Sequence, residues 1–432
     1  MSNKKLSPKK LGNIAHIEMG QSPDSVYYLT EAFGVPLIQG NADIKNRQSI
    51  QRIWTTYVTK ECSAGDILMT VRAPVGSIGI ASRYSCIGRG VCAIKATDVY
   101  SDYLYHLLIY NEENWKALEQ GSTFTAVNFK EIFNFPLLVV NSKTEQKKIA
   151  QILSTTDTVI EKTQATIAKY KAIKQGMLND LFIRGIDIKT GKLRLNQKDA
   201  PELYKESELG WIPKEWDMDK LEHLTEKIGS GVTPTGGSEI YKTSGVLFLR
   251  SQNVLVSRLN IKDAAFITTE IDEKMAGSRV KPFDVLLNIT GASIGRCAYF
   301  PVELNSANVN QHVCIIRFKN SSSSLAFYAS EFMNSHFGQS QINRSNAGGN
   351  REGLNFQQIK SFSFPVVIPS ELDKIATIIE SQANFIQIEI NYLQKLQKIK
   401  SGLMADLLSG NKLVSIPKEM ETQNVKQLVW QK

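Results

Sequence analysis

The chain has 432 residues, a formal net charge of +9 and a pI near 9.1. This length is enough for two or three domains with their own cores, and the basic charge favours a polyanionic partner, although solubility alone also explains it. Five cysteines without a C-x-x-C spacing argue against a zinc site or a disulfide framework, and predict a reducing, cytoplasmic setting. We expect no signal peptide and no membrane span, because no run approaches the ~18 apolar residues required.

An internal repeat organises the chain. Each half begins with a leucine and a turn, continues through short β-branched runs broken by Gly/Ser turns, and passes a polar glycine loop before an aromatic–proline strand. The matched segments are PLIQGNADI (36–44) with VLFLRSQNV (246–254), DILMTVRAPVGSIG (66–79) with DVLLNITGASIG (284–295), VCAIK (91–95) with VCIIR (313–317), QGSTFTAVNF (120–129) with AGGNREGLNF (347–356), and FPLLVV (135–140) with FPVVIP (364–369).

Each half closes with a long helical segment, 145–182 and 371–408, in the same register, so that Lys174 falls on Lys400. The apolar residues recur with a 3.5-residue period, which is typical of a coiled-coil seam. We expect the two helices to pack on each other antiparallel, because a lone helix with this seam exposed is poorly soluble; the alternative is that each packs on its own globule. The seam residues are Ile149, Leu153, Ile160, Ile167, Tyr170, Met177 and Leu181, then Ile375, Ile379, Ile386, Leu393, Leu396, Leu403 and Leu407.

These features predict an α+β protein in which two pseudo-symmetric domains are joined by two long antiparallel coiled-coil helices. The polar, turn-rich segment between the halves has the composition of a linker. The expected boundaries are a first domain at 1–142, a first helix at 143–184, a linker at 185–208, a second domain at 209–370, a second helix at 371–409 and a C-terminal tail at 410–432.

Six segments, taken together in their order along the chain, resemble one family, the specificity (S) subunit of type I restriction–modification systems. The resemblance covers nearly the whole chain. They are LGWIPKEW (209–216), which resembles the boundary motif before the second domain, GDILMTVRAPVGSIG (65–79), EQKKIAQIL (145–153), LDKIATII (372–379), MLNDLF (177–182) and LMADLL (403–408).

The resemblance implies two target-recognition domains, each reading one half of a split double-stranded DNA sequence. It also implies that the helices set the spacer length and dock methyltransferase (M) subunits, two per complex, and through them restriction (R) subunits, also two. In this family the S subunit has no active site, so S-adenosylmethionine, ATP and magnesium are expected on the partners and no cofactor on this chain. The two half-sites and the spacer length cannot be read from the sequence.

One departure concerns the first domain, which lacks a full preceding copy of the 209–216 motif. SIPKEM (415–420) near the C-terminus matches WIPKEW (211–216) at four positions. The family is described as circularly organised, so we expect residues 411–420 to pack against the first domain and complete it. The alternative is a frayed tail.

A search for chemistry within the chain finds only near misses. There is no Pro-Pro dipeptide for an amino-methyltransferase motif, and the spacing from Gly185 to Gly191 and Lys192 is too long for a P-loop. Asp272 to Lys274 fits a D-x-K fragment that is too short to carry a nuclease assignment. A stand-alone DNA-modifying or DNA-cleaving enzyme therefore remains the alternative, and no catalytic or metal-binding residue is predicted. A pure coiled-coil scaffold would not explain two diverged, basic globules.

Candidate DNA-binding residues follow from the side chains that read base edges, mainly Arg, Lys, Asn and Gln. They follow strand ends, flank the strand–turn–strand segments, or lie in the loop 343–351, where glycine permits close approach of the backbone to a ligand. For any one of them, a solvated surface charge is the simpler explanation. The candidates are Lys45, Arg47, Arg52, Arg72, Arg83 and Arg89 in the first half, and Arg250, Gln252, Asn253, Arg296, Arg344, Asn350 and Arg351 in the second.

Overall fold

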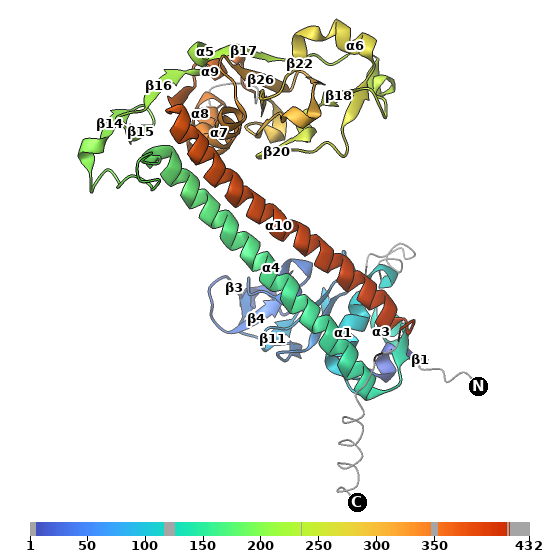
Figure 1. Ribbon diagram of the computed structural model, residues 1–432. Helices are drawn as coiled ribbons and strands as arrows, with labels where there is room; N and C mark the ends of the chain where they lie inside the picture. The colour runs from blue at the N-terminus through green and yellow to red at the C-terminus, as the bar shows by residue number, and fades with distance from the viewer. Residues whose placement is uncertain (1–5, 116–125, 235, 347–352, 413, 415–432) are drawn as a thin grey trace, which may run out of the picture. The chain divides into compact units, whose positions relative to one another are not determined.

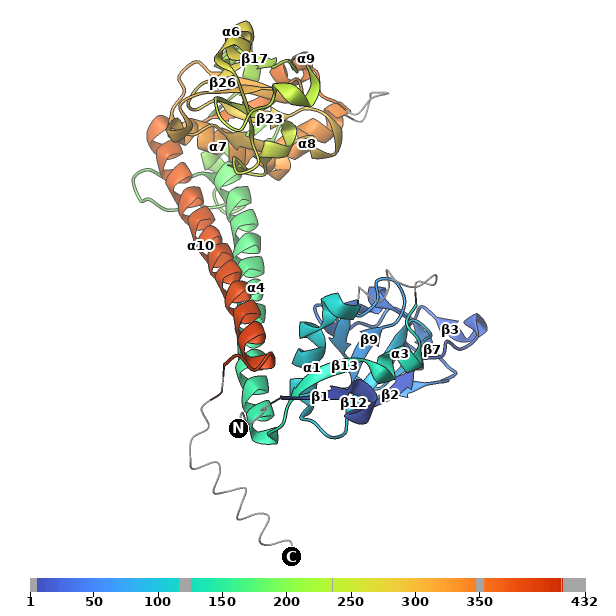
Figure 2. The same ribbon diagram turned by 90° about the vertical axis from the view of Figure 1, so that its right-hand side faces the viewer.

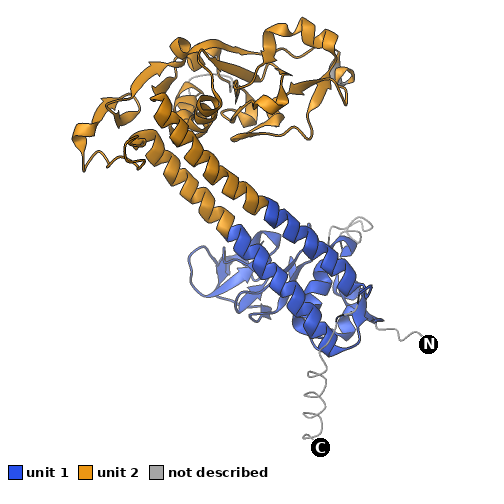
Figure 3. Ribbon diagram, in the orientation of Figure 1, with its two compact units in different colours: residues 1–165, 391–432 blue, residues 166–390 orange. Residues whose placement is uncertain are grey.

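The computed structural model describes residues 6–115, 126–234, 236–346, 353–412 and 414. The chain divides into two compact units (Figure 3): unit 1 comprises residues 1–165 and 391–432, and unit 2 comprises residues 166–390. Both units combine small β-sheets with helices, which confirms the predicted α+β class. Among the described residues, no helix is both long enough and apolar enough to cross a bilayer.

Unit 1 is built on two larger sheets and one two-stranded sheet, and their buried residues contribute to its core. Strand β1 (Leu6–Lys10) pairs antiparallel with β13 (Pro136–Val140), and the helices are α1 (Ser101–Tyr110) and α3 (Phe129–Asn134). The six-stranded sheet has the order β2 (Ala15–Met19), β12 (Val91–Ala96), β9 (Ile67–Thr70), β10 (Ile78–Ile80), β6 (Gln48–Ser49), β5 (Ile44–Lys45), and the five-stranded sheet has the order β3 (Tyr28–Leu29), β7 (Trp54–Thr55), β4 (Val35–Ile38), β11 (Ser85–Ile87), β8 (Glu61–Cys62).

Unit 2 repeats this plan with larger sheets of four strands each. Its hairpins and pairs are β14 (Tyr204–Ser207) with β15 (Gly210–Pro213), β16 (Asp217–Lys220) with β27 (Ser363–Val366), and β19 (Val254–Leu255) with β20 (Arg258–Leu259). Its four-stranded sheets have the orders β17 (Thr225–Ser230), β26 (Val313–Phe318), β23 (Val285–Asn288), β24 (Cys297–Tyr299) and β21 (Ala265–Ile267), β18 (Val246–Leu249), β25 (Ala307–Val309), β22 (Arg279–Val280). Its helices are α5 (Leu221–Leu224), α6 (Thr269–Lys274), α7 (Ser323–Asn334), α8 (His336–Asn346) and α9 (Phe356–Lys360).

Two long helices, α4 (Lys143–Arg184) and α10 (Pro369–Leu408), contribute to both units (Figure 1, Figure 2). In unit 1 the start of α4 shares a core cluster with the end of α10, and in unit 2 the end of α4 shares one with the start of α10, so the helices are antiparallel within each unit. Every predicted seam residue is buried or half-buried. Both packing alternatives hold in part, because each shared cluster also includes residues of that unit's globule.

The lysine that interrupts both helices is paired differently in the two units. Lys174 of α4 forms a 2.9 Å ion pair with Glu331 of α7, a residue of the unit 2 globule. Lys400 of α10 forms its ion pair with Asp157, which lies on the other long helix. Both lysine side chains are largely buried, at 16% and 19% exposed, so the repeated lysines are satisfied by acids at unrelated positions.

The structure corrects one step of the repeat alignment. The two aromatic–proline motifs place Phe135 on Phe364. However, Leu11 donates its backbone N–H to the carbonyl oxygen of Phe135, whereas the equivalent Leu221 donates to Phe362, each at 3.0 Å. Phe362 is therefore the counterpart of Phe135. A shift of two residues leaves the same face of a strand inward, so the hydrophobic pattern could not reveal it.

The segment expected to be a linker, 185–208, folds against unit 2. The Arg194 guanidinium donates to the fully buried carboxylate of Glu371, with Nη2 2.9 Å from Oε2. The same carboxylate accepts the backbone N–H of Ile186 at 2.7 Å and the indole N–H of Trp216 at 3.0 Å. A single buried acid therefore ties the segment, the 209–216 motif and the start of α10 together.

The tail beyond α10 is described only in part. Val414 packs against the unit 1 core, and a side chain at Gly410 would meet Leu6 of β1. The repeated motif at 415–420 lies outside the described residues. Its expected packing on the first domain stays a prediction.

Candidate nucleic-acid interface

Polar loops converge at one end of the unit 1 sheets. Three backbone hydrogen bonds join the ends of neighbouring strands. Gly20 N–H donates to Val91 O at 3.0 Å, Gly88 N–H donates to Ile38 O at 2.8 Å, and Val71 N–H donates to Gly90 O at 2.9 Å. The strands β2, β4, β9 and β12 therefore deliver four loop segments to one place.

These segments enclose an open polar cleft of about 680 Å³. Arg72 follows β9 and Arg89 precedes β12, and both side chains are exposed. The loop after β4 contributes Gln39 and Asn41, so two guanidinium groups and two amides meet around one concavity. Arginine and amide side chains present the paired donors and acceptors that base edges require. The remaining lining residues are Ser22, Pro23, Asp24, Ser25, Tyr28, Gly40, Ala73 and Gly90.

Unit 2 makes the same connections with different side chains. Asn310 N–H donates to Leu249 O at 3.2 Å, and Ile289 N–H donates to His312 O at 3.0 Å. These bonds match Gly88 to Ile38 and Val71 to Gly90, so Thr290 occupies the position of Arg72 and Gln311 that of Arg89.

The unit 2 side chains at these positions form a hydrogen-bonded cluster. The Thr290 hydroxyl lies 2.6 Å from His312 Nδ1, and Gln311 Nε2 lies 3.1 Å from His312 Nε2. Thr233 donates its hydroxyl to Gln311 Oε1. At the end of β18, the Arg250 guanidinium lies over the Tyr241 ring at 5.2 Å, and its buried Nε has no hydrogen-bond partner among the described residues. Thr290 and Gln311 offer a hydroxyl and an amide where unit 1 offers two arginines.

Three arginines predicted to bind DNA lie outside the unit 1 cleft. Arg47 occupies the positive-φ turn of the β5–β6 hairpin, donates to Ile78 O at 3.0 Å and pairs with Glu112. Arg52 pairs with the buried Asp43 at 3.4 Å. Arg83 is exposed in the turn between β10 and β11, and Lys45 is exposed on β5.

In unit 2 the structure overturns one candidate. Asn253 is 1% exposed, and its side chain accepts from Arg250 N at 2.9 Å and donates to Asn260 O at 3.0 Å. Asp43 accepts two backbone N–H groups in the same way in unit 1, so this position holds the loop together and is not available to DNA.

The other candidates of unit 2 are more dispersed. Gln252 and Arg296 are exposed, and Arg344 lies on α8 with its Nε donating to Ser340 O at 3.2 Å. Asn350 and Arg351 lie outside the described residues.

Sequence reasoning missed several residues that the structure brings to these sites. They are Ser22, Gln39 and Asn41 in unit 1 and Thr233, Thr290, Gln311 and His312 in unit 2. Gln311 and His312 directly precede the VCIIR strand, as Arg89 and Gly90 precede VCAIK. Extending the repeat alignment by two residues would have found them.

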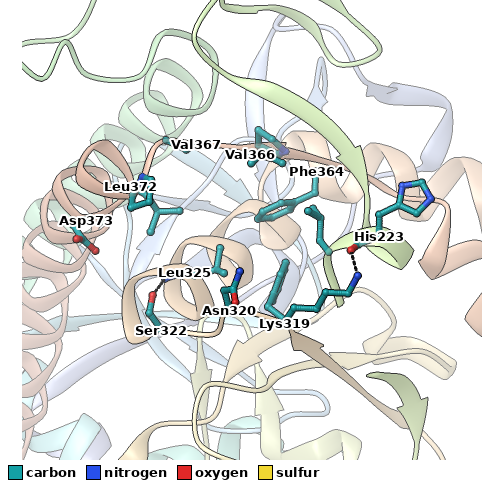
Figure 4. A pocket seen from close by; sticks show the side chains of 14 residues that line it. His223, Lys319, Asn320, Ser322, Leu325, Phe364, Val366, Val367, Leu372 and Asp373 are labelled. Carbon is teal, nitrogen blue, oxygen red and sulfur yellow. Dashed lines mark hydrogen bonds between the residues drawn. The ribbon is translucent and has the colours of Figure 1, made fainter. Parts of the chain in front are cut away.

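Unit 2 also contains a mainly apolar cavity of about 560 Å³ (Figure 4), which is separate from the hydrogen-bonded cluster around His312. It lies where β27 meets α10, and Phe318, Phe364 and Leu372 are among its lining residues. In unit 1 the corresponding place holds two hydrogen-bonded polar side chains: the Tyr103 hydroxyl accepts from Val140 N at 3.0 Å, and Gln146 donates to Val140 O at 2.7 Å. When α7 is matched to α1, Leu325 takes the position of Tyr103. When α10 is matched to α4, Leu372 takes the position of Gln146.

This difference predicts opposite effects of exchanging the two residues. Tyr103→Leu should lower the free energy of unfolding by about 2–4 kcal/mol, because it opens a cavity and leaves Val140 N–H unpaired. Leu325→Tyr should raise it by about 0.5–1 kcal/mol by filling existing space. Chemical denaturation of the full chain measures both. A destabilising Leu325→Tyr would show that the cavity cannot accept a ring.

The comparisons with known proteins agree with this architecture. A family model described as the type I restriction modification DNA specificity domain matches residues 3–171 and 213–401. A putative type I restriction enzyme MjaX specificity subunit from Methanocaldococcus jannaschii is 33% identical over 185 residues, which cover 42% of this chain and 43% of the relative. The aligned part therefore spans less than half of that relative's length.

Two solved structures share the fold. The S subunit of a type I restriction–modification system from M. genitalium superposes with a TM-score of 0.60 at 14% identity, covering 96% of this chain and 98% of that one. A chain from work on complex assembly and conformational transition of the type I R-M system gives a TM-score of 0.53 at 12% identity, covering 94% and 97%. At these identities the likeness shows the fold alone.

Proposed function

Because the chain belongs to the family of type I restriction–modification DNA specificity domains, we propose that it is the non-catalytic subunit that selects the DNA sequence of such a complex. The proposed target is a split double-stranded sequence, with unit 1 reading one half and unit 2 the other. Methyltransferase and restriction subunits, two of each, would carry S-adenosylmethionine, ATP and magnesium. No observation favours the alternative of a stand-alone enzyme.

One observation carries the proposal: equivalent loop positions in the two units hold different polar side chains, of the kinds that can read base edges. Arg72 and Arg89 in unit 1 correspond to Thr290 and Gln311 in unit 2, while the backbone hydrogen bonds that position them are the same. A conserved frame with exchanged donors and acceptors is what two readers of different sequences need. The net charge of +9 supplies the sequence-independent attraction to phosphate.

Partner docking finds support on the outer face of α10 within unit 2. Ile378, Phe385 and Ile388 follow helical spacing and are 38%, 56% and 62% exposed. A shallow hollow of about 320 Å³ lies among Phe385, Ile388 and the polar residues Thr377, Glu380, Ser381 and Asn384. An exposed apolar stripe on a helix is typical of a surface that another helix covers. We assign this face to a methyltransferase subunit.

The proposal is tested by mapping methylation genome-wide. The chain is co-expressed with its neighbouring methyltransferase gene in a host free of methylation, and long-read sequencing records modified bases, expected to be N6-methyladenine. A split motif should be methylated only when this chain is present. A soluble, co-purified complex that methylates no specific sequence would contradict the proposal.

A further inference from the structure

An exposed apolar patch borders the unit 1 cleft. Val26, Tyr27, Phe33 and Tyr57 are 76%, 42%, 68% and 55% exposed, and together they are termed the apolar rim. Water-exposed side chains of this size on one edge are costly unless a partner covers them. The rim belongs to no core cluster of unit 1.

Strand pairing places the rim residues at one end of a sheet. Thr55 of β7 pairs with Tyr28 of β3 on one side and with Val35 of β4 on the other. Both pairings are antiparallel, so the end of β7 lies beside the starts of β3 and β4, and each rim residue is within two residues of one of these strand ends. The Tyr27 and Tyr57 rings lie 5.2 Å apart. The rim thus gathers at one end of three neighbouring strands, with β3 at the edge of its sheet.

Local hydrogen bonds hold the apolar rim in place. Asp24 accepts the backbone N–H of Val26 at 3.0 Å and caps the short turn that presents it. Thr56 N–H donates to Tyr27 O at 3.3 Å. Gly34, at φ +84°, lies so close to Thr55 O that a Cβ would be 2.4 Å away, so Phe33 is carried by a turn that requires glycine. The rim is preorganised, which lowers the entropic cost of binding.

The rim is continuous with the proposed DNA cleft. Asp24 and Ser25 line that cleft and directly precede Val26, and Tyr28 lines it on the other side of Tyr27. Arg72 and Arg89 lie around the same concavity. A DNA duplex held by these arginines would therefore extend over the apolar rim. The counterpart in unit 2 differs: Gly245 matches Gly34, since a Cβ on it would lie 2.5 Å from Ile267 O, so Ser244 takes the position of Phe33.

We propose that the apolar rim is a DNA-contacting wedge, in which Val26 and Phe33 press into a base step of the half-site that unit 1 reads and partly unstack it. Apolar side chains inserted between base steps are an established way for proteins to deform a duplex and read its deformability. The inference rests on the proposed function and adds to it a second, shape-dependent source of specificity confined to one half-site.

The test uses the full chain in complex with its methyltransferase. The probe is a duplex carrying the split sequence from the methylation map, with 2-aminopurine placed in turn at each first-half position except the methylated adenine. Wild-type complex should raise the fluorescence at one step. Val26→Ser with Phe33→Ser should abolish that rise and weaken binding roughly tenfold, while Leu138→Ser, at a residue of β13 that is 55% exposed, should change neither.

The outcomes separate the two proposals. Unchanged affinity and an unchanged fluorescence profile in the double variant would overturn the wedge and leave the specificity role intact. Loss of methyltransferase co-purification would also overturn it, because the rim would then be a protein-docking face. If wild-type complex recognises no split sequence, the proposed function fails first and the wedge falls with it.

Discussion

Glu371→Ala should destabilise unit 2 by about 3–5 kcal/mol, because it leaves the buried Arg194 cation with only the exposed Glu215, 3.7 Å away, as an acid. The Arg194 side chain is 7% exposed, and Glu371 is its fully buried partner. The substitution also removes the acceptor for the Trp216 indole N–H and the Ile186 N–H. Guanidinium denaturation of the full chain should show an early transition that the wild type lacks.

The matched control is a solvent-exposed ion pair of the same unit. Lys205 and Asp217 lie 3.1 Å apart with side chains 39% and 81% exposed, so Asp217→Ala should cost less than about 1 kcal/mol. Glu371→Gln tests the effect of the charge separately from that of the side-chain volume. The Gln amide keeps the volume, but its N–H group would face the N–H groups that donate to Glu371. A Glu371→Ala chain as stable as the control would show that the 185–208 segment is not anchored by this acid.

Arg72→Ala and Arg89→Ala should each weaken DNA binding by about 1–3 kcal/mol if the side chain contacts a base, and should relax specificity in one half-site only. Gln311→Ala should relax the other half-site, because it occupies the equivalent position in unit 2. Fluorescence anisotropy at fixed salt, with duplexes altered in one half at a time, measures both effects.

Arg83→Ala serves as the control for the loss of positive charge. Arg83 is exposed in unit 1 but does not line the cleft, so its removal should weaken binding slightly and equally for all sequences. A uniform loss with Arg72→Ala would assign that residue to phosphate contact. If variants in either unit relaxed the same half-site, the assignment of one half-site to each unit would be wrong.

The long helices and the repeat could be predicted because both leave periodic signals that depend on few residues. The seam residues of α4 and α10 are all at least half-buried as expected. The site was harder, since a polar residue after a strand has the same sequence signature whether it faces solvent or holds a loop. Asn253 and Gln252 are neighbours, yet one is buried and hydrogen-bonded to backbone while the other is exposed.

The role of Glu371 was also beyond sequence reasoning. Its partners Ile186 and Arg194 lie in a polar segment far from it along the chain, with no periodicity to mark them. The linker expectation followed composition, and composition does not record that one buried carboxylate gathers three donors. Long-range polar networks of this kind become visible only once the backbone is placed.

The unequal pairing of the repeated lysines has a consequence for grafting a foreign globule onto this chain. Lys400 finds its acid on the neighbouring helix, where Asp157 also lies 3.9 Å from His106 Nδ1 of the first globule, so a foreign first globule would remove a neighbour of that pair but not its acid. Lys174 depends on Glu331, which belongs to the second globule and would leave with it. A transplanted second globule must therefore bring an acid at the matching position of its own α7, or Lys174 must change with it. The two globules are thus not equally free to diversify.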